Sequence, residues 1–195
     1  MKLGRVLGVV ALLAAIAYPA LVYIGLTRWS SRLVALVVIA MAVLTVAAKL
    51  ADAKRSTGLT GLLAVPLCIV SLALLSALSD SQFFLLLTPV LISVALLVTF
   101  SLTLRKGATP MIERFARLQD PDLTADKVIW CRTTTVVWCG FFIFNGLLSA
   151  GLAAWAPLEW WTLYTGAGAY LLMGTLFLGE VVLRKLRFEM GSSHP

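Results

Sequence analysis

The run FFLLLTPVLISVALLVTFSLTL, Phe83–Leu104, contains no charged residue and decides the fold class. As a helix rising about 1.5 Å per residue it would be about 33 Å long, enough to cross about 30 Å of hydrocarbon. Five further runs share its apolar character. We therefore predict six transmembrane helices, at Val6–Leu26, Leu33–Ala48, Gly58–Leu78, Phe83–Leu104, Thr133–Ala156 and Thr162–Leu183.

Composition independently indicates a membrane protein. Of the 195 residues, 61% are hydrophobic and 13% are charged, whereas a soluble domain is about 45–50% apolar and about 25% charged. So short a chain cannot hide that much apolar surface in a core of its own. We predict an all-α, polytopic membrane helix bundle, with one domain over residues 1–188 and a flexible tail at 189–195. A soluble enzyme and a secreted disulfide scaffold are excluded.

The first two runs each leave an alternative. The first resembles a signal peptide because Lys2 and Arg5 precede it, but its apolar residues continue to Leu26, so we expect it to be retained as a helix. The second run is short, and a five-span arrangement would merge or drop it. The two arginines between these runs, Arg28 and Arg32, favour six spans because hydrocarbon accepts them only at high cost.

The basic residues predict the orientation. With a cytoplasmic amino terminus, fourteen of the sixteen Lys and Arg residues face the cytoplasm, and only Arg28 and Arg32 face outward. By the positive-inside rule, both termini are then cytoplasmic. This topology, with anionic lipids of the cytoplasmic leaflet as partners, explains the net charge of +7 better than nucleic-acid binding does. The cytoplasmic set is Lys2, Arg5, Lys49, Lys54, Arg55, Arg105, Lys106, Arg114, Arg117, Lys127, Arg132, Arg184, Lys185 and Arg187.

The long polar stretch at residues 105–132 contains an amphipathic segment. Pro110 suits the first position of a helix because no N–H donor is needed there, and Thr109 is predicted to cap it. Such a helix, with a basic polar side, is predicted to lie on the cytoplasmic membrane surface. Its apolar residues share one face by their spacing and its arginines lie elsewhere: Met111, Ile112, Phe115 and Leu118, with Arg114 and Arg117.

A second helix is predicted to follow, capped by Thr124 and running through Trp130 into the fifth span, so that it projects beyond the bilayer. Acidic residues near its start, Asp120, Asp122 and Asp126, could hold a divalent metal. Asp beside proline is more typical of a turn, and Asp in a first helical turn complements the helix dipole. The only histidine is His194, in the tail. We predict no metal site and no cofactor.

Two polar residues inside the predicted spans are candidate site residues. Asn145 lies near the middle of the fifth span, so we expect it to bond to another helix or to face a polar cavity. Glu180 lies one turn before Arg184, and we expect an ion pair between them, with a proton-relay role as the alternative. Prolines at 19, 66 and 89 are expected to kink their spans, as in transporters.

A set of residues in the second half of the chain carries a family resemblance. They are Thr109-Pro110-Met111-Ile112-Glu113-Arg114, Leu123-Thr124, Trp130-Cys131-Arg132, Trp138, Phe141-Phe142-Ile143, Gly146, Trp155, Pro157 and Trp161. This pattern resembles the bacterial intracellular septation protein A (YciB) family. The closing stretch, from Trp161 to Arg184, is similar to a related group of uncharacterised membrane proteins found beside aryl polyene and xanthomonadin-type pigment genes in Gram-negative bacteria.

The resemblance implies a multi-pass protein of the bacterial inner (cytoplasmic) membrane. It implies a non-enzymatic role in envelope integrity or septation, through contacts with lipids and other inner-membrane proteins, and it leaves homo-oligomers open. It supplies no catalytic residues. The chain has Arg132 where the family often has Lys.

Three functions follow as hypotheses. A non-enzymatic envelope protein is the first, and a closed helical core would favour it. A carrier or accessory protein for lipid-like molecules, such as aryl polyene precursors, is the alternative, and a cavity lined by Asn145 and the kinked spans would favour it. A membrane enzyme is the third, and it would need clustered acids at a cavity mouth, for which the sequence has no convergent set.

Overall fold

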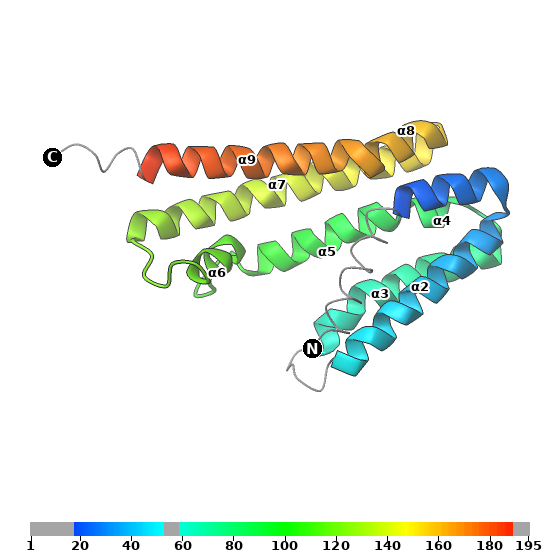
Figure 1. The fold of residues 1–195 in the computed structure, drawn as a ribbon, viewed down its shortest axis with the longest axis horizontal. Helices are drawn as coiled ribbons and strands as arrows, with labels where there is room; N and C mark the ends of the chain where they lie inside the picture. The colour runs from blue at the N-terminus through cyan, green and yellow to red at the C-terminus, as the bar shows by residue number, and fades with distance from the viewer. Residues whose placement is uncertain (1–17, 53–58, 189–195) are drawn as a thin grey trace.

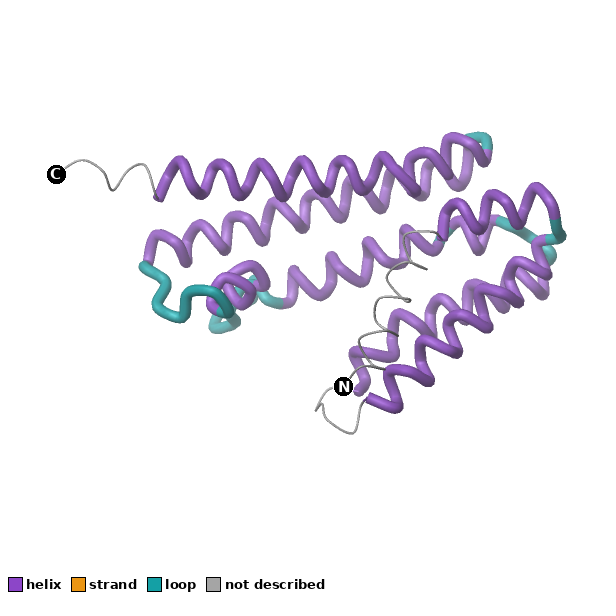
Figure 2. Tube along the Cα trace, in the orientation of Figure 1, coloured by secondary structure: helices purple, strands orange, loops and turns teal. Residues whose placement is uncertain are grey.

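The computed structural model describes residues 18–52 and 59–188, and every regular element within them is helical (Figure 2). The all-α class is therefore confirmed for the described residues. Residues 6–17 of the first predicted span and the tail at 189–195 lie outside them. The elements are a helical segment at 18–28, α2 (Ser31–Asp52), α3 (Leu59–Ser79), α4 (Phe83–Leu86), α5 (Thr88–Leu102), α6 (Met111–Arg117), α7 (Ala125–Trp155), α8 (Leu158–Leu163), the π-helix η2 (Tyr164–Gly168) and α9 (Ala169–Phe188).

In the first half of the chain, α2 and α3 form an antiparallel hairpin (Figure 1). Its buried core joins Val34, Ala35 and Val38 of α2 to Ala73 of α3 and Leu85 of α4. The segment 18–28 comes close to this hairpin at Gly25, where a Cβ atom would lie 2.7 Å from a methyl carbon of Val34. A larger residue at position 25 would therefore push the segment away from α2.

Pro89 breaks the fourth predicted span into α4 and α5. Proline has no N–H, so the carbonyl of Leu85, four residues earlier, receives no bond from it. The hydroxyl of Tyr18 donates to that carbonyl at 2.9 Å, and Trp161 Nε1 donates to the neighbouring carbonyl of Leu86 at 3.1 Å. Two other helical segments thus satisfy the backbone at the break, as the interior of a bilayer requires.

In the second half of the chain α5 packs against α7, and α9 runs in nearly the same direction as both in the view of Figure 1. Between α5 and α7 the packing is close at Gly146, where a Cβ atom would lie 3.3 Å from Ser93 Cβ. Two hydrogen bonds link α7 to the chain segment that contains η2 and α9. One runs from Tyr164 to Asn145 and the other from Trp130 to Glu180. The α2–α3 hairpin meets these helices at the end that holds α4 and α8, and it diverges from them toward its other end (Figure 1).

Within the described part of the chain, three helical stretches are long and apolar enough to cross a membrane, namely Phe83–Leu102, Ala125–Trp155 and Leu158–Phe188. They coincide with the last three predicted spans. Among the residues whose side chains are described, α2 and α3 contain the shorter apolar stretches Ser31–Val43 and Cys68–Ser79. With 31 residues, α7 is about 46 Å long, which is more than the thickness of about 30 Å of a hydrocarbon layer.

Candidate functional site

A cavity of about 360 Å³ lies between the first half of the chain and the helices α5, α7 and α9. This volume falls within the range of about 300–1,000 Å³ that is usual for small-molecule pockets. Its walls are mostly aliphatic and aromatic. The lining residues are Tyr18, Pro19, Val38, Met41, Ala42, Ile69, Thr88, Pro89, Ile92, Ser93, Leu96, Phe141, Phe142, Asn145, Ser149, Thr165, Ala169, Tyr170 and Met173.

Irregular helix geometry shapes this cavity. Pro89, at the break between α4 and α5, lines it together with Pro19. In addition, η2 interrupts the last helical stretch and places Thr165 in the lining. The same π-turn approaches the first segment, since a Cβ atom at Gly166 would lie 3.6 Å from Pro19 Cβ. Single π-turns inside α-helices are frequently found at functional sites.

Asn145 lines the cavity and joins three helical elements. Its Nδ2 donates to Ser93 Oγ on α5 at 2.9 Å, and its Oδ1 accepts from the hydroxyl of Tyr164 in η2 at 2.8 Å. The Ser93 hydroxyl in turn donates to the carbonyl of Pro89 at 2.9 Å. The amide therefore both holds the wall together and contributes a polar group to it.

Glu180 lies apart from the cavity lining. Its Oε1 accepts from Trp130 Nε1 at 3.4 Å and lies 4.0 Å from Arg184 Nε, so the expected pairing with Arg184 is present but long. Arg187 stacks over the Trp130 ring at 5.5 Å, and Phe188 meets that ring edge-on. These contacts fasten the last turns of α9 to the start of α7.

The amphipathic helix is present as α6, but it differs from the prediction at its start. Pro110 is the N-cap residue and Met111 the first helical residue, so Thr109 does not cap the helix. The hydroxyls of Thr103 and Thr135 instead accept the N–H groups of Met111 at 3.0 Å and Ile112 at 3.3 Å. Likewise, Thr124 is the N-cap of α7 but makes no side-chain capping bond.

The apolar residues of α6 do not behave as one face. Phe115 and Leu118 are 54% and 82% exposed, whereas Met111 and Ile112 are partly buried. Glu113 is buried, and both Nε and Nη2 of the partly exposed Arg117 contact its Oε1, the shorter contact being 2.7 Å. Arg114 is exposed and bonds to the carbonyl of Thr109. The helix thus buries the carboxylate of Glu113, which is paired with Arg117, and leaves Phe115 and Leu118 at the surface.

Of the three acidic residues near the start of α7, Asp120 has a basic partner. Asp120 accepts a hydrogen bond from Lys127 Nζ at 3.0 Å, and this bond lowers the pKa of the Asp120 carboxyl below its ordinary value. Among the side chains that the structure describes, at residues 18–43 and 68–188, no group of three His, Cys, Asp or Glu residues is placed to hold an ion.

Asn145 is the polar cavity residue that the sequence singled out, and Ser149, Thr165 and Tyr170 are among those that it did not. Ser149 lies four residues after Asn145, so its position on the same face of α7 could have been read from helical spacing. Thr165 and Tyr170 could not, because the π-turn that contains Thr165 shifts the register of the helix before Tyr170.

Comparisons with protein-family models, with curated proteins and with solved structures find no match to this chain. The resemblance to the septation protein A family therefore rests on the quoted sequence pattern alone.

Proposed function

We propose that this protein is a carrier or accessory protein that holds a lipid-like molecule inside the membrane. The observation that carries the proposal is the cavity whose lining includes Asn145 together with Pro19 and Pro89, the combination that the carrier hypothesis requires. A pocket of apolar walls with a few fixed polar groups is the usual form of a small-molecule site. Precursors of aryl polyene pigments, which the sequence resemblance implies, are one class of such molecules.

The cavity supports this role over the two other hypotheses. A purely structural envelope protein has no need of a pocket lined by an amide, and a membrane enzyme needs acids or bases that converge on its substrate. Among the described residues that line the cavity, none is acidic, basic or histidine. The septation role drawn from the resemblance remains the second candidate. It is favoured by α9, whose described side chains include no buried residue and which thus presents apolar surface to lipid or to another membrane protein.

The cavity can be tested by filling it. In Ala42→Phe, a benzyl group would replace a methyl group in the cavity wall, whereas Ala40→Phe places the same group on the exposed face of the same helix. The full chain in lipid nanodiscs would be exposed to C16 probes that share one photoreactive diazirine chain and differ only in the headgroup. We expect at least one probe to label peptides of α5, α7 or α9. Ala42→Phe should lower that labelling at least about tenfold, because its benzyl group fills the part of the cavity that the alkyl chain of the probe would occupy.

The control Ala40→Phe should be labelled like the unmodified protein. Both variants must also keep the circular-dichroism signal of their helices on heating. Labelling that is absent for every probe, or that Ala42→Phe leaves unchanged, contradicts the carrier function.

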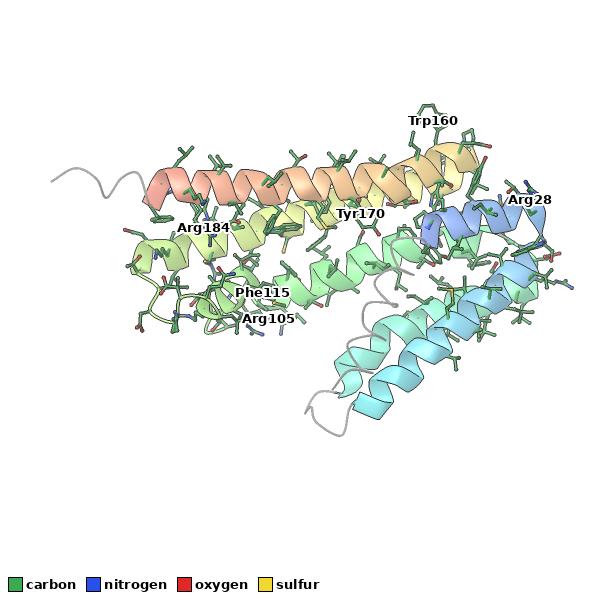
Figure 3. All side chains as sticks on the ribbon, in the orientation of Figure 1. Arg28, Arg105, Phe115, Trp160, Tyr170 and Arg184 are labelled. Carbon is green, nitrogen blue, oxygen red and sulfur yellow. The ribbon has the colours of Figure 1, made fainter. Side chains whose placement is uncertain are left out.

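We also propose that the chain crosses a bacterial inner membrane six times and has both termini in the cytoplasm. Arg105 and Arg184 lie at one end of the molecule, and Arg28 and Trp160 lie at the other (Figure 3). At this second end Asp80 accepts a hydrogen bond from Ser31 at 2.6 Å and lies 3.7 Å from Arg32, so the outer basic residues include a paired one. The positions of these labelled arginines support the proposed orientation.

Cysteine labelling tests this orientation. In a background without Cys68, Cys131 and Cys139, a cysteine at the exposed position Gln82 should react with an impermeant thiol reagent added to intact cells. A cysteine at the exposed position Lys106 should react only after the cells are opened. The reverse pattern would overturn the orientation.

A further inference from the structure

Among the residues that the structure describes, the polar groups that line the cavity are all uncharged. They belong to Tyr18, Thr88, Ser93, Asn145, Ser149, Thr165 and Tyr170. A charged headgroup placed among them would lose its water and would gain no opposite charge in return, which is strongly unfavourable in a low-dielectric interior. The occupant best matched to this lining, if the carrier function holds, is itself uncharged.

Most of the cavity hydroxyls already have partners within the wall. Tyr18 donates to Leu85, Ser93 to Pro89, and Thr165 to Trp161, in each case to a backbone carbonyl. Ser149 and the exposed Tyr170 are the exceptions, and Ser149 is the buried one of the two. Its side chain is completely buried, and its hydroxyl is the buried side-chain polar atom that finds no hydrogen-bond partner among the described residues. An unsatisfied buried hydroxyl is unusual in a folded protein and calls for a physical explanation.

The position of Ser149 on α7 shows which end of the site is polar. Phe141, Asn145 and Ser149 are spaced by four residues, so they follow one another along the same face, about 6 Å apart per step. The wall therefore changes from aromatic through amide to hydroxyl toward the end of the molecule where α8 lies.

Two other helices of the wall repeat this gradient. On α5, Thr88 and Ser93 precede Leu96, and along the last helical stretch Thr165 precedes Met173. Because α5 begins and α7 ends at the same side of the molecule (Figure 1), their polar positions lie toward the α8 end and their apolar positions toward the α6 end.

We propose that the cavity binds an uncharged, single-chain amphiphile, such as a long-chain alcohol, amide or ester, with its oxygen-bearing headgroup at Ser149 and its chain directed along Phe141, Leu96 and Met173. The Ser149 hydroxyl donates to or accepts from the headgroup oxygen, and the spare N–H of the Asn145 amide is one turn away. This assignment rests on the proposed carrier function and specifies the ligand class and its orientation.

The experiment is competition against a photoreactive C16 alcohol bound to the full chain in nanodiscs. The competitors are hexadecanol and hexadecanamide, which are neutral, and hexadecyl sulfonate and hexadecyltrimethylammonium, which carry fixed charges. We expect the neutral pair to displace the probe at least about tenfold more effectively than either charged compound. A diazirine beside the headgroup should label peptides around Ser149 and Thr165, and one at the chain end should label peptides around Phe141 and Leu96.

Ser149→Ala tests the headgroup contact itself. The loss of one neutral hydrogen bond should weaken displacement by hexadecanol about 2- to 10-fold, while displacement by hexadecane should not change. The control Ser101→Ala removes an exposed hydroxyl that bonds to its own helix on α5, and it should change neither value. The heat stability of both variants is measured in the same nanodiscs, because removing an unpaired hydroxyl should not destabilise the wall.

The outcomes separate the ligand class from the carrier function. Three results would overturn a neutral headgroup at Ser149: equal competition by sulfonate and alcohol, reversed labelling positions, or displacement by hexadecanol that Ser149→Ala leaves unchanged. If labelling is still lost in Ala42→Phe, the carrier function is preserved. Probe labelling that is insensitive to Ala42→Phe would remove both.

Discussion

Trp161→Ala should lower the free energy of unfolding by about 3–5 kcal/mol, the usual cost of truncating a large buried aromatic side chain. Trp161 has no exposed surface and packs in a cluster with Val22 and Leu86. Its Nε1 also donates to the Leu86 carbonyl beside the break at Pro89. The substitution therefore removes a core side chain and a hydrogen bond at the point where both halves of the chain meet. Unfolding in mixed micelles, followed by circular dichroism, gives the value.

Two further variants separate these effects. Trp161→Phe keeps most of the ring volume but removes the donor, so we expect a smaller loss of about 1–3 kcal/mol from the unsatisfied carbonyl. The neighbouring Trp160 is 61% exposed, and Trp160→Ala should change stability by about 0.5 kcal/mol or less. Equal losses at positions 160 and 161 would show that the buried contact with Leu86 does not anchor α8.

Hydropathy predicted the helices well because an apolar segment in lipid must pair its backbone N–H and C=O groups with each other, and a helix does this within one segment. The apolar run at Phe83–Leu104 is helical over Phe83–Leu102, apart from the break, and the helix predicted to start after Thr124 begins at Ala125. The break itself was signalled by Pro89. Its repair by Tyr18 and Trp161 was not, since it depends on which distant segments come together.

The cavity is a tertiary feature that no local pattern contains. Asn145 was identified because an amide inside a span always needs a partner. That it bonds to both Ser93 and Tyr164, and also faces a cavity, follows from the crossing of α5, α7 and the π-turn, and the sequence left bonding and cavity lining as alternatives. Ser149 carries no such warning, because a serine in a helix is ordinary until its hydroxyl is found buried and unpaired.

The amphipathic reading of α6 was only partly right, for a reason that charge explains. Helical periodicity assigns every carboxylate to the water-facing side. Glu113 nevertheless turns inward, because Arg117 lies one turn away and neutralises it. Met111 and Ile112 are partly buried through the same packing against α7, which leaves Phe115 and Leu118 as the exposed apolar residues.

Arg117→Ala should therefore destabilise this region more than the loss of a surface ion pair would. Removing one partner of a buried pair costs about 3–5 kcal/mol because a charge is left without compensation. Since the Arg117 side chain is 42% exposed, solvent screening reduces the expected loss to about 2–3 kcal/mol. The exposed Arg105→Ala provides the control, with a change of about 0.5 kcal/mol or less.

The double variant Glu113→Leu/Arg117→Leu decides whether the carboxylate is the cause. Replacing a buried ion pair with apolar residues of similar size is often neutral, so the double variant should recover most of the stability that Arg117→Ala loses. Protection of the amides of α6 from hydrogen exchange in nanodiscs would report the same order of stability within the helix itself. If the double variant is as unstable as Arg117→Ala, the arginine acts through its other contact, the hydrogen bond from Nη1 to the Pro121 carbonyl at 2.9 Å, and α6 is held by the loop that follows it rather than by Glu113.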